Sequence, residues 1–437
     1  MRRSRLYCLT WVAIFAAMLD YRFFANVPGA PSITILQLTS LVSLLVLVVL
    51  AATKPAALKG TWVIAREGRW VLMYFFWVGV AALWGVLQSN YESAAHAEDL
   101  LPGLVLFVLV ILSVHSRGDL QGLLTAYKMG MVIEVVLGAC QAVFGAPRPV
   151  PLAEVAQWKT DLSGAVLAVP EKLPAGLLMH PNGYALFLIP FALLLTAGLF
   201  YQQRRNVGRR LANACLLLCL YLVLWRDYTK GAYAWMALGS ALVLLPPAFS
   251  RARTAFGWFI LFGGVVSLSV LSLSAGIGTV LSRFGLWRAA LVVLGDPLVF
   301  ALGNGSNAML EESMVYSNMY YPSSHNTFLD QAIVFGAPAL LFYGAVAVRS
   351  IRTAARLPTL LPPNERGVAI FLHAGFVVLL GGFFFEPALF GTMVQAEFFL
   401  LAGFTVVLCR LLVREQMWHE RRGNLPYRFP FGVRDIY

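Results

Sequence analysis

The chain has 437 residues, of which 59% are hydrophobic and only 12% charged, and its net charge at pH 7 is +12. Soluble proteins carry about 25% charged residues, so this composition, with a mean hydropathy of +0.74, excludes an ordinary soluble enzyme. Apolar runs of roughly 20 residues, the length that crosses a bilayer as a helix, recur along the chain. We therefore predict an all-α integral membrane protein that forms one polytopic membrane domain over residues 1–437.

The apolar runs predict about twelve transmembrane helices. The first run follows a basic start, Met1-Arg2-Arg3-Ser4-Arg5, and no clear small-residue cleavage site follows it. We therefore expect a retained helix rather than a signal peptide. The expected spans are approximately 6–26, 31–53, 69–88, 99–116, 120–144, 182–201, 209–226, 229–249, 254–281, 327–348, 367–387 and 390–413.

The basic residues predict how these spans are oriented. Most of the 33 Lys and Arg fall on one side of the expected spans, together with both termini. Because Lys and Arg collect on the cytoplasmic side of membrane proteins, we expect cytoplasmic N and C termini and a basic cytoplasmic tail over 414–437. The cations lie in short loops, so we expect no nucleic-acid partner. The opposite side carries only Arg148, Lys159, Lys172, Arg226, Lys230, Arg283 and Arg288.

Two outward-facing segments are long, and we expect them to form most of the external face. One covers about 145–179 and is rich in proline, and the other covers 282–326, between the ninth and tenth expected spans. The second begins with apolar residues at helical spacing and stops at Gly295-Asp296-Pro297, which predicts a short helix at the membrane surface. The apolar residues concerned are Phe284, Trp287, Ala290, Leu291 and Leu294.

One histidine stands out at the end of the second outer segment. His325 lies between Ser324 and Asn326, where the tenth span is expected to begin. Histidine titrates near neutral pH and can act as a general base. The alternative is a structural residue at a helix start. His180 and Asn182 at the start of the sixth span form a second candidate polar patch, or only a helix cap.

Four outward cations are candidates for binding an anion. Arg226 and Lys230 flank the turn between spans seven and eight, while Arg283 and Arg288 lie at the start of the second outer segment. Guanidinium groups bind phosphate oxygens in pairs, so cations that meet in one outer cavity would suit a diphosphate. The alternative is snorkelling at the lipid headgroups. Neither H-E-x-x-H nor C-x-x-C spacing occurs, so we expect no metal and no other cofactor.

In four stretches the chain resembles the bacterial O-antigen ligase and O-antigen polymerase superfamily of polytopic glycosyltransferases. The similarity covers about 180–345 together with the twelve-span layout. In the last stretch, Ser324-His325-Asn326 is followed by nine residues and then Gly336, which is similar to the ligase pattern. The other three are Met179-His180-Pro181-Asn182-Gly183-Tyr184-Ala185, Thr229-Lys230-Gly231-Ala232, and Arg283 with Trp287, Asp296-Pro297-Leu298 and Gly303-Asn304-Gly305.

The resemblance implies an inner-membrane enzyme that transfers a glycan from undecaprenyl diphosphate on the periplasmic side, without metal and with inversion of the anomeric centre. It implies His325 as the base, with Arg226, Lys230, Arg283 and Arg288 at the diphosphate and with Asn326, His180 and Asn182 in support. The acceptor would be the lipid A-core sugar of lipopolysaccharide. Two positions depart from the family pattern. Lys230 replaces an arginine, and Ala339 stands where ligases prefer Gly, Thr or Tyr. Because the second departure is from the ligase pattern, a polymerase that uses the same donor is the alternative.

A transporter for a lipid-linked or anionic substrate belongs to a different functional class. Transporters often contain internal repeats and helices that are interrupted near the bilayer midplane. The sequence has no clear internal repeat, and its polar candidates cluster towards one face. These features favour an enzyme at the membrane surface over a transporter.

Overall fold

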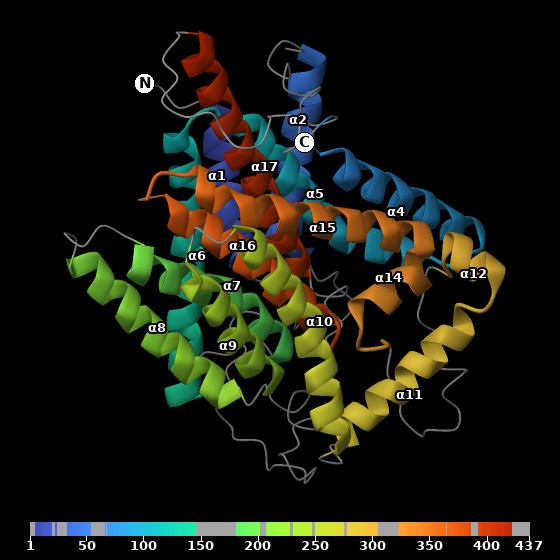
Figure 1. The fold of residues 1–437 in the computed structure, drawn as a ribbon. Coiled ribbons are helices and arrows are strands. Elements are labelled where there is room, and N and C mark those ends of the chain that lie inside the picture. Colours follow the sequence, from blue (N-terminus) through green and yellow to red (C-terminus); the bar gives the residue numbers. More distant parts are fainter. Residues whose placement is uncertain are drawn as a thin grey trace.

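The protein is a helical bundle with one pair of two-residue strands in its described part (Figure 1). In these strands, β1 (Arg22–Phe23) and β2 (Ile33–Thr34), Arg22 lies opposite Thr34 in an antiparallel register. The computed structural model describes residues 5–19, 22–23, 33–53, 66, 68–145, 181–201, 207–227, 230–246, 250–274, 278–304, 323–363, 365–385 and 392–421. The predicted outer segment 145–179, apart from Gly145, lies outside these residues, and so does the part of the predicted tail 414–437 that follows Arg421.

The described helices follow the apolar runs of the sequence. In chain order they are α1 (Arg5–Ala17), α2 (Ile35–Thr53), α4 (Arg69–Leu87), α5 (Glu92–Ser113), α6 (Arg117–Phe144), α7 (Pro181–Tyr201), α8 (Val207–Asp227), α9 (Lys230–Leu244), α10 (Ser250–Ser274), α11 (Gly278–Val293), α12 (Pro297–Leu302), α14 (Thr327–Phe335), α15 (Ala337–Leu360), α16 (Arg366–Phe383) and α17 (Thr392–Arg421).

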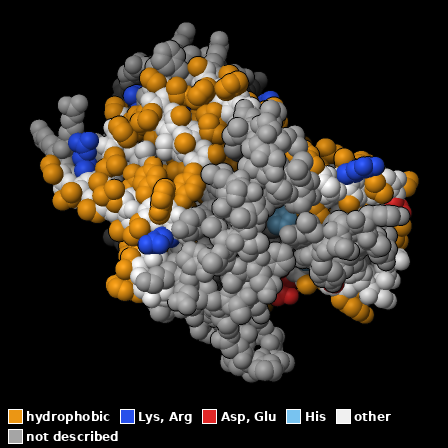
Figure 2. All heavy atoms as spheres, turned by 90° about the horizontal axis from the view of Figure 1, so that it is seen from below, with side chains coloured by type: hydrophobic (Ala, Val, Ile, Leu, Met, Phe, Trp, Pro, Cys, Tyr) orange, Lys and Arg blue, Asp and Glu red, His pale blue; other side chains and the backbone are white. Residues whose placement is uncertain are grey.

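Within the described ranges, eight helices are long and apolar enough to cross a membrane, namely α2, α4, α5, α6, α7, α8, α16 and α17. Shorter apolar stretches lie in α1, α9 and α10. Large hydrophobic side chains such as Leu45 of α2 and Leu218 of α8 are more than 60% exposed, which suits contact with lipid. On the face drawn in Figure 2, hydrophobic side chains cover much of the described part, with only scattered Lys and Arg. The fold is therefore that of an all-α membrane-embedded protein, whereas the count of twelve spans stays a prediction.

Helices α16 and α17 form the centre of the bundle. In the most apolar part of α17, 94% of the residues are buried, against 17% in α2. Small residues allow the neighbouring helices to approach closely, as is usual where helices pack within membranes. A Cβ atom on Gly381 of α16 would lie 2.2 Å from the Trp235 ring of α9, and one on Gly103 of α5 would lie 2.6 Å from Phe399 of α17.

Polar contacts join several helix ends on one side of the bundle. Arg117, at the start of α6, forms ion pairs with Glu365 before α16 and with Glu415 in α17. Nearby, Arg410 of α17 donates hydrogen bonds to the backbone oxygens of Ile111 and Val114 at the end of α5, at 3.0 and 2.6 Å. These contacts place the starts of α6 and α16 and the later part of α17 at the same end of the bundle.

The predicted tenth span, 327–348, is two helices instead of one. α14 ends at Phe335 and α15 begins at Ala337, because Gly336 between them has a φ of 83°. This left-handed conformation is open to glycine and ends an α-helix. With nine residues, α14 is too short to cross a bilayer. The end of the predicted ninth span, 254–281, is also divided, since α10 ends at Ser274 and α11 begins at Gly278.

Candidate functional site

The described parts of the outer segment 282–326 contain the predicted short helix, as α11, and a second helix, α12, that the sequence analysis did not predict. α11 ends at Val293, and Asp296 then caps α12 by accepting hydrogen bonds from the backbone nitrogens of Leu298 and Val299. The predicted stop at Gly295-Asp296-Pro297 is thus confirmed. The buried face of α11 differs in part from the predicted stripe, because Leu291 is 62% exposed. The buried residues of this helix include Leu286, Ala289, Ala290 and Val293.

α11 and α12 pack against α14, so the two ends of the outer segment meet. Leu286 and Ala290 of α11, Val299 of α12 and Ile333 of α14 belong to one apolar cluster. Aromatic rings extend this contact from α11 to the end of α16, because Trp287 lies 6.1 Å from Phe385 between ring centroids. The helix that carries Arg283 and Arg288 is therefore a direct neighbour of the helix that follows His325.

Backbone contacts between two glycines fix the far end of α14 against α12. Gly303 and Gly336 both have positive φ angles. A Cβ on Gly303 would lie 2.3 Å from the oxygen of Val334, so only glycine fits at this contact. The backbone nitrogen of the next residue, Asn304, donates to the oxygen of Ile333 at 2.7 Å. The spacing from His325 to Gly336, noted in the sequence, thus covers one short helix and its closing turn.

α4 also holds α14 in place, and no pattern in the sequence indicated this contact. The hydroxyl of Tyr74 donates to Gln331 at 2.9 Å, and the indole nitrogen of Trp77 donates to the backbone oxygen of Phe335 at 3.0 Å. Asn90, just after α4, donates to the oxygen of Asn304 at 2.8 Å. Tyrosine, tryptophan and asparagine within or beside an apolar run are too common to predict partners more than 200 residues away.

The start of α14 is organised by Asn326 and by a serine–aspartate cluster, formed by Ser323, Ser324 and Asp330. The Asn326 side chain accepts hydrogen bonds from the backbone nitrogens of Phe328 and Leu329, at 3.0 and 3.2 Å, and so caps the helix. Asn326, predicted as a supporting residue, therefore has a clear structural role.

Asp330 is fully buried and accepts three hydrogen bonds within the serine–aspartate cluster. They come from the hydroxyls of Ser323 and Ser324, both at 2.7 Å, and from the backbone nitrogen of Ser324 at 2.8 Å. Burial raises the pKa of the Asp330 carboxyl to about 6, while the serine hydrogen bonds act in the opposite direction. The cluster therefore fixes the two residues that precede His325.

His325 sits at the bend between this cluster and the helix cap. Its φ is 53°, a left-handed conformation that is uncommon for residues other than glycine. Its backbone nitrogen donates to the hydroxyl of Ser323 at 3.0 Å. Ser324 and Asn326 are buried, whereas His325 is half-buried. His325 is thus the least buried of these three residues.

Arg283 and Arg288 lie on different faces of α11. Five residues on an α-helix correspond to a rotation of about 140°, and Arg288 is exposed whereas Arg283 is half-buried. Arg283 is seven residues from Ala290, which is about 20° short of two full turns, so it shares the face that packs on α14. Of the two predicted cations, Arg283 is the one on the face of α11 that packs on α14.

The other predicted site residues are less closely connected with α14. Arg226 is exposed at the end of α8, a helix that packs mainly on α6 and α7. Lys230 begins α9 and Asn182 lies in the first turn of α7, but their side chains, like all of His180, are outside the described residues. α7 begins at Pro181, as expected.

Aromatic rings lie near the candidate base, and of this group only Trp287 was expected from the sequence. Phe328, three residues after His325, lies 4.7 Å from Phe384 and 6.3 Å from Tyr343 between ring centroids. Trp287 and Phe385 continue the group. The indole nitrogen of Trp287 is buried and has no hydrogen-bond partner among the described residues. Phe328, Phe384 and Trp287 are half-buried, whereas Tyr343 and Phe385 are buried, so only part of the group reaches the surface.

No group of three or more His, Cys, Asp or Glu side chains that could hold a metal ion occurs in the described part of the chain. Comparison of the chain with known protein families and with functionally characterised proteins gave no match.

Proposed function

We propose that the protein is a membrane glycosyltransferase of the O-antigen ligase type. The observation that carries the proposal is the position of His325, a half-buried histidine on a bend fixed by Asp330, at the start of the helix that packs beside the helix containing Arg283. A rigid support of this kind suits a base that must remain within hydrogen-bonding distance of a substrate hydroxyl. Arginine on the neighbouring helix suits the diphosphate of a lipid-linked donor.

In the proposed reaction the hydroxyl of an acceptor sugar attacks the anomeric carbon of the donor glycan. His325 takes the hydroxyl proton as the new glycosidic bond forms. The bond between the anomeric carbon and the diphosphate oxygen breaks, and undecaprenyl diphosphate leaves with the bonding electrons. Arg283 stabilises the charge that develops on this leaving group. Attack from the opposite face of the sugar inverts the anomeric centre.

The other predicted cations have secondary places in the proposal. Arg226 and Lys230 lie at the ends of α8 and α9, where they attract the anionic donor towards the site without a defined contact. Arg288, on the exposed face of α11, belongs to the same group. The aromatic group around Phe328 and Trp287 provides a surface for the donor's polyprenyl chain or for a sugar ring.

The proposed orientation follows from the distribution of basic residues. The N and C termini face the cytoplasm, and the spans number about twelve. His325 lies on the periplasmic side of the inner membrane. Lipid-linked glycans would reach the site from the bilayer. The acceptor is the sugar of the lipid A core.

Reconstitution tests the proposal and separates it from its alternatives. Purified protein in liposomes receives an undecaprenyl-diphosphate glycan, either alone or with core-bearing lipopolysaccharide. Glycan attached to the core is the expected product. Longer lipid-linked chains made without the core would identify a polymerase. Movement of the donor between leaflets without any new glycosidic bond would identify a transporter.

Arginine variants test the donor site. Arg283→Gln should raise the KM for the donor more than Arg288→Gln does, because only Arg283 shares the face of α11 that packs on α14. The two variants remove the same charge from the same helix, so they are matched. Equal effects, or a larger effect for Arg288→Gln, would remove Arg283 from its proposed role.

A further inference from the structure

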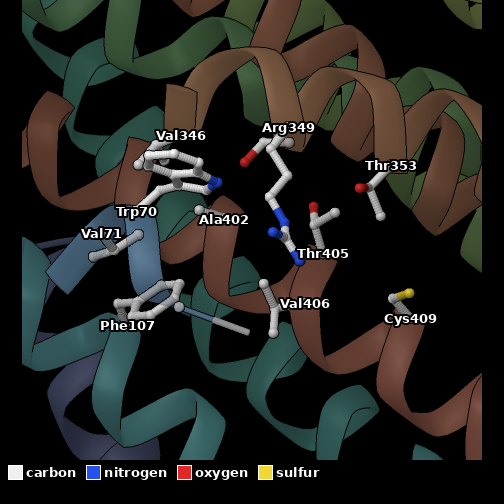
Figure 3. Close-up of a pocket in the computed structure, with 12 residues that line it drawn as sticks. Trp70, Val71, Phe107, Val346, Arg349, Thr353, Ala402, Thr405, Val406 and Cys409 are labelled. Atoms are coloured by element: carbon white, nitrogen blue, oxygen red, sulfur yellow. The ribbon is translucent and has the colours of Figure 1, made fainter. Parts of the chain in front are cut away.

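A pocket that is partly open to the surface lies between α4, α5, α15 and α17, and its empty space, counted together with the solvent at its mouth, is about 490 Å³. Figure 3 shows the Arg349 side chain extending into it from α15. Apolar walls come from Trp70 of α4, Phe107 of α5 and Val406 of α17. The pocket is thus largely apolar, with one guanidinium directed inwards.

This pocket is separate from the proposed glycosyltransfer site. None of the residues around His325 or on α11 lines it. It lies towards the end of the bundle where Arg117 forms its ion pairs, since Cys409 lines it and the next residue, Arg410, is bonded to the end of α5. Arg69, beside the pocket, stacks over Trp70 at 5.2 Å. The distribution of basic residues predicts that this end faces the cytoplasm.

The lining fits an amphiphile with an anionic head. Arg349 can bind phosphate oxygens with two parallel hydrogen bonds, and the hydroxyls of Ser350 and Thr353 lie on the same stretch of α15. The apolar walls would make favourable contacts with an acyl chain but none with a free phosphate ion. Basic pockets between membrane helices on the cytoplasmic side commonly bind anionic lipid headgroups.

We propose that this pocket binds one anionic phospholipid from the surrounding leaflet. Its phosphate contacts Arg349, and the first part of an acyl chain lies against Trp70, Phe107 and Val406. A lipid at this position contacts four helices at once, so it joins α4 and α15 to the central helix α17.

Native mass spectrometry of the full chain tests the proposal. The protein is exposed to phosphatidylglycerol and to phosphatidylcholine with the same acyl chains, and the retained lipid is measured. Wild type should retain phosphatidylglycerol preferentially. The Arg349→Gln variant should prefer phosphatidylglycerol about fivefold less strongly than wild type does, because one basic residue near an anionic headgroup contributes about that much. Arg352→Gln, an exposed arginine on the same helix, should keep it. Equal preference in wild type and Arg349→Gln would overturn the proposal.

A second variant and a free ion complete the test. Val406→Trp fills the apolar part of the pocket with Arg349 intact, and it should also reduce phosphatidylglycerol retention. If Arg349→Gln does not fold, unchanged retention by Val406→Trp overturns the proposal. Inorganic phosphate at millimolar concentration should not displace the lipid. Displacement would mean that the pocket binds a free anion, which contradicts the lipid assignment.

Discussion

The left-handed backbone of His325 stands out at the scale of single residues. A non-glycine residue in this conformation costs about 1–3 kcal/mol, which the hydrogen bonds of the serine–aspartate cluster and the cap of Asn326 must offset. Strain of this kind often accompanies functional positions. At His325 the bend that causes the strain also leaves the residue less buried than its neighbours Ser324 and Asn326.

Substitutions of His325 separate its chemical role from its structural cost. Both His325→Ala and His325→Gly should lower turnover about 10²- to 10⁴-fold, the usual contribution of a general base. His325→Gly should nevertheless be more stable than His325→Ala by about 1 kcal/mol, because glycine adopts φ near 53° without strain. Thermal unfolding and glycan transfer measure the two effects. His115→Ala, an exposed histidine before α6, is the control, and retained turnover in His325→Ala would refute the mechanism.

The buried carboxyl of Asp330 predicts a pH dependence of stability. The folded pKa of Asp330, about 6, lies above its ordinary value of 3.8, so the folded state holds this proton more tightly than the unfolded state. The contribution that this bound proton makes to the free energy of unfolding is fully present below pH 3.8 and is lost as the pH rises through 6. Asp330→Asn cannot titrate. Between pH 4 and pH 7 the free energy of unfolding of wild type should therefore fall by up to about 3 kcal/mol relative to that of Asp330→Asn.

Unfolding curves of both proteins at pH 4, 5, 6 and 7 measure this difference. The test depends on how the difference in free energy of unfolding between the two proteins changes with pH, because Asp330→Asn also alters the hydrogen bonds of the cluster at every pH. A constant gap between the two proteins would show that Asp330 does not titrate in this range.

At the scale of elements, the division of the predicted tenth span determines where the site lies. The sequence between Thr327 and Val348 is apolar enough to suggest one span, and hydrophobicity alone cannot reveal the break at Gly336. The break becomes visible only where the backbone of Gly336 meets Gly303 and Ala301. It separates α14, which follows the candidate base, from the longer α15.

This contact predicts a large effect from a single methyl group. Gly336→Ala should destabilise the protein by at least about 1–2 kcal/mol, because its φ is left-handed and its Cβ would lie 2.5 Å from the oxygen of Ala301. Gly344→Ala is the matched control within α15, where a Cβ meets nothing within 4 Å. That control should be neutral or slightly stabilising. Equal melting temperatures for the two variants would contradict the packing of α12 on α14.

Pattern and composition predicted some parts of the structure and not others. The apolar runs located the long helices, and Gly295-Asp296-Pro297 located the end of α11, because these signals are local. The hydrogen bonds from Tyr74 and Trp77 to α14 were not predictable, since they join residues more than 200 positions apart. The different faces of Arg283 and Arg288 follow from their spacing, but the face that meets α14 required the structure. The roles proposed for His325 and Arg283 stay predictions.

For the whole molecule, the main prediction concerns orientation. The two ends of α5 should lie on opposite sides of the membrane, with Glu92 outside and His115 inside. In a background without the native cysteines, Glu92→Cys should react with an impermeant maleimide in intact spheroplasts. His115→Cys should react only after the membrane is opened. The reverse pattern would invert the proposed topology and place His325 on the cytoplasmic side.

The central position of α17 has a consequence for biogenesis. This helix follows α5, α15 and α16 in the chain, yet it packs against all three. During synthesis the earlier helices enter the bilayer before α17 does. Until α17 inserts, lipid or a helper protein covers the helix faces that it will later contact. The Tyr127 hydroxyl, which donates to Glu397 of α17 at 2.6 Å, has no such partner until then. Assembly of the bundle is therefore completed late, when α17 displaces whatever has filled its place.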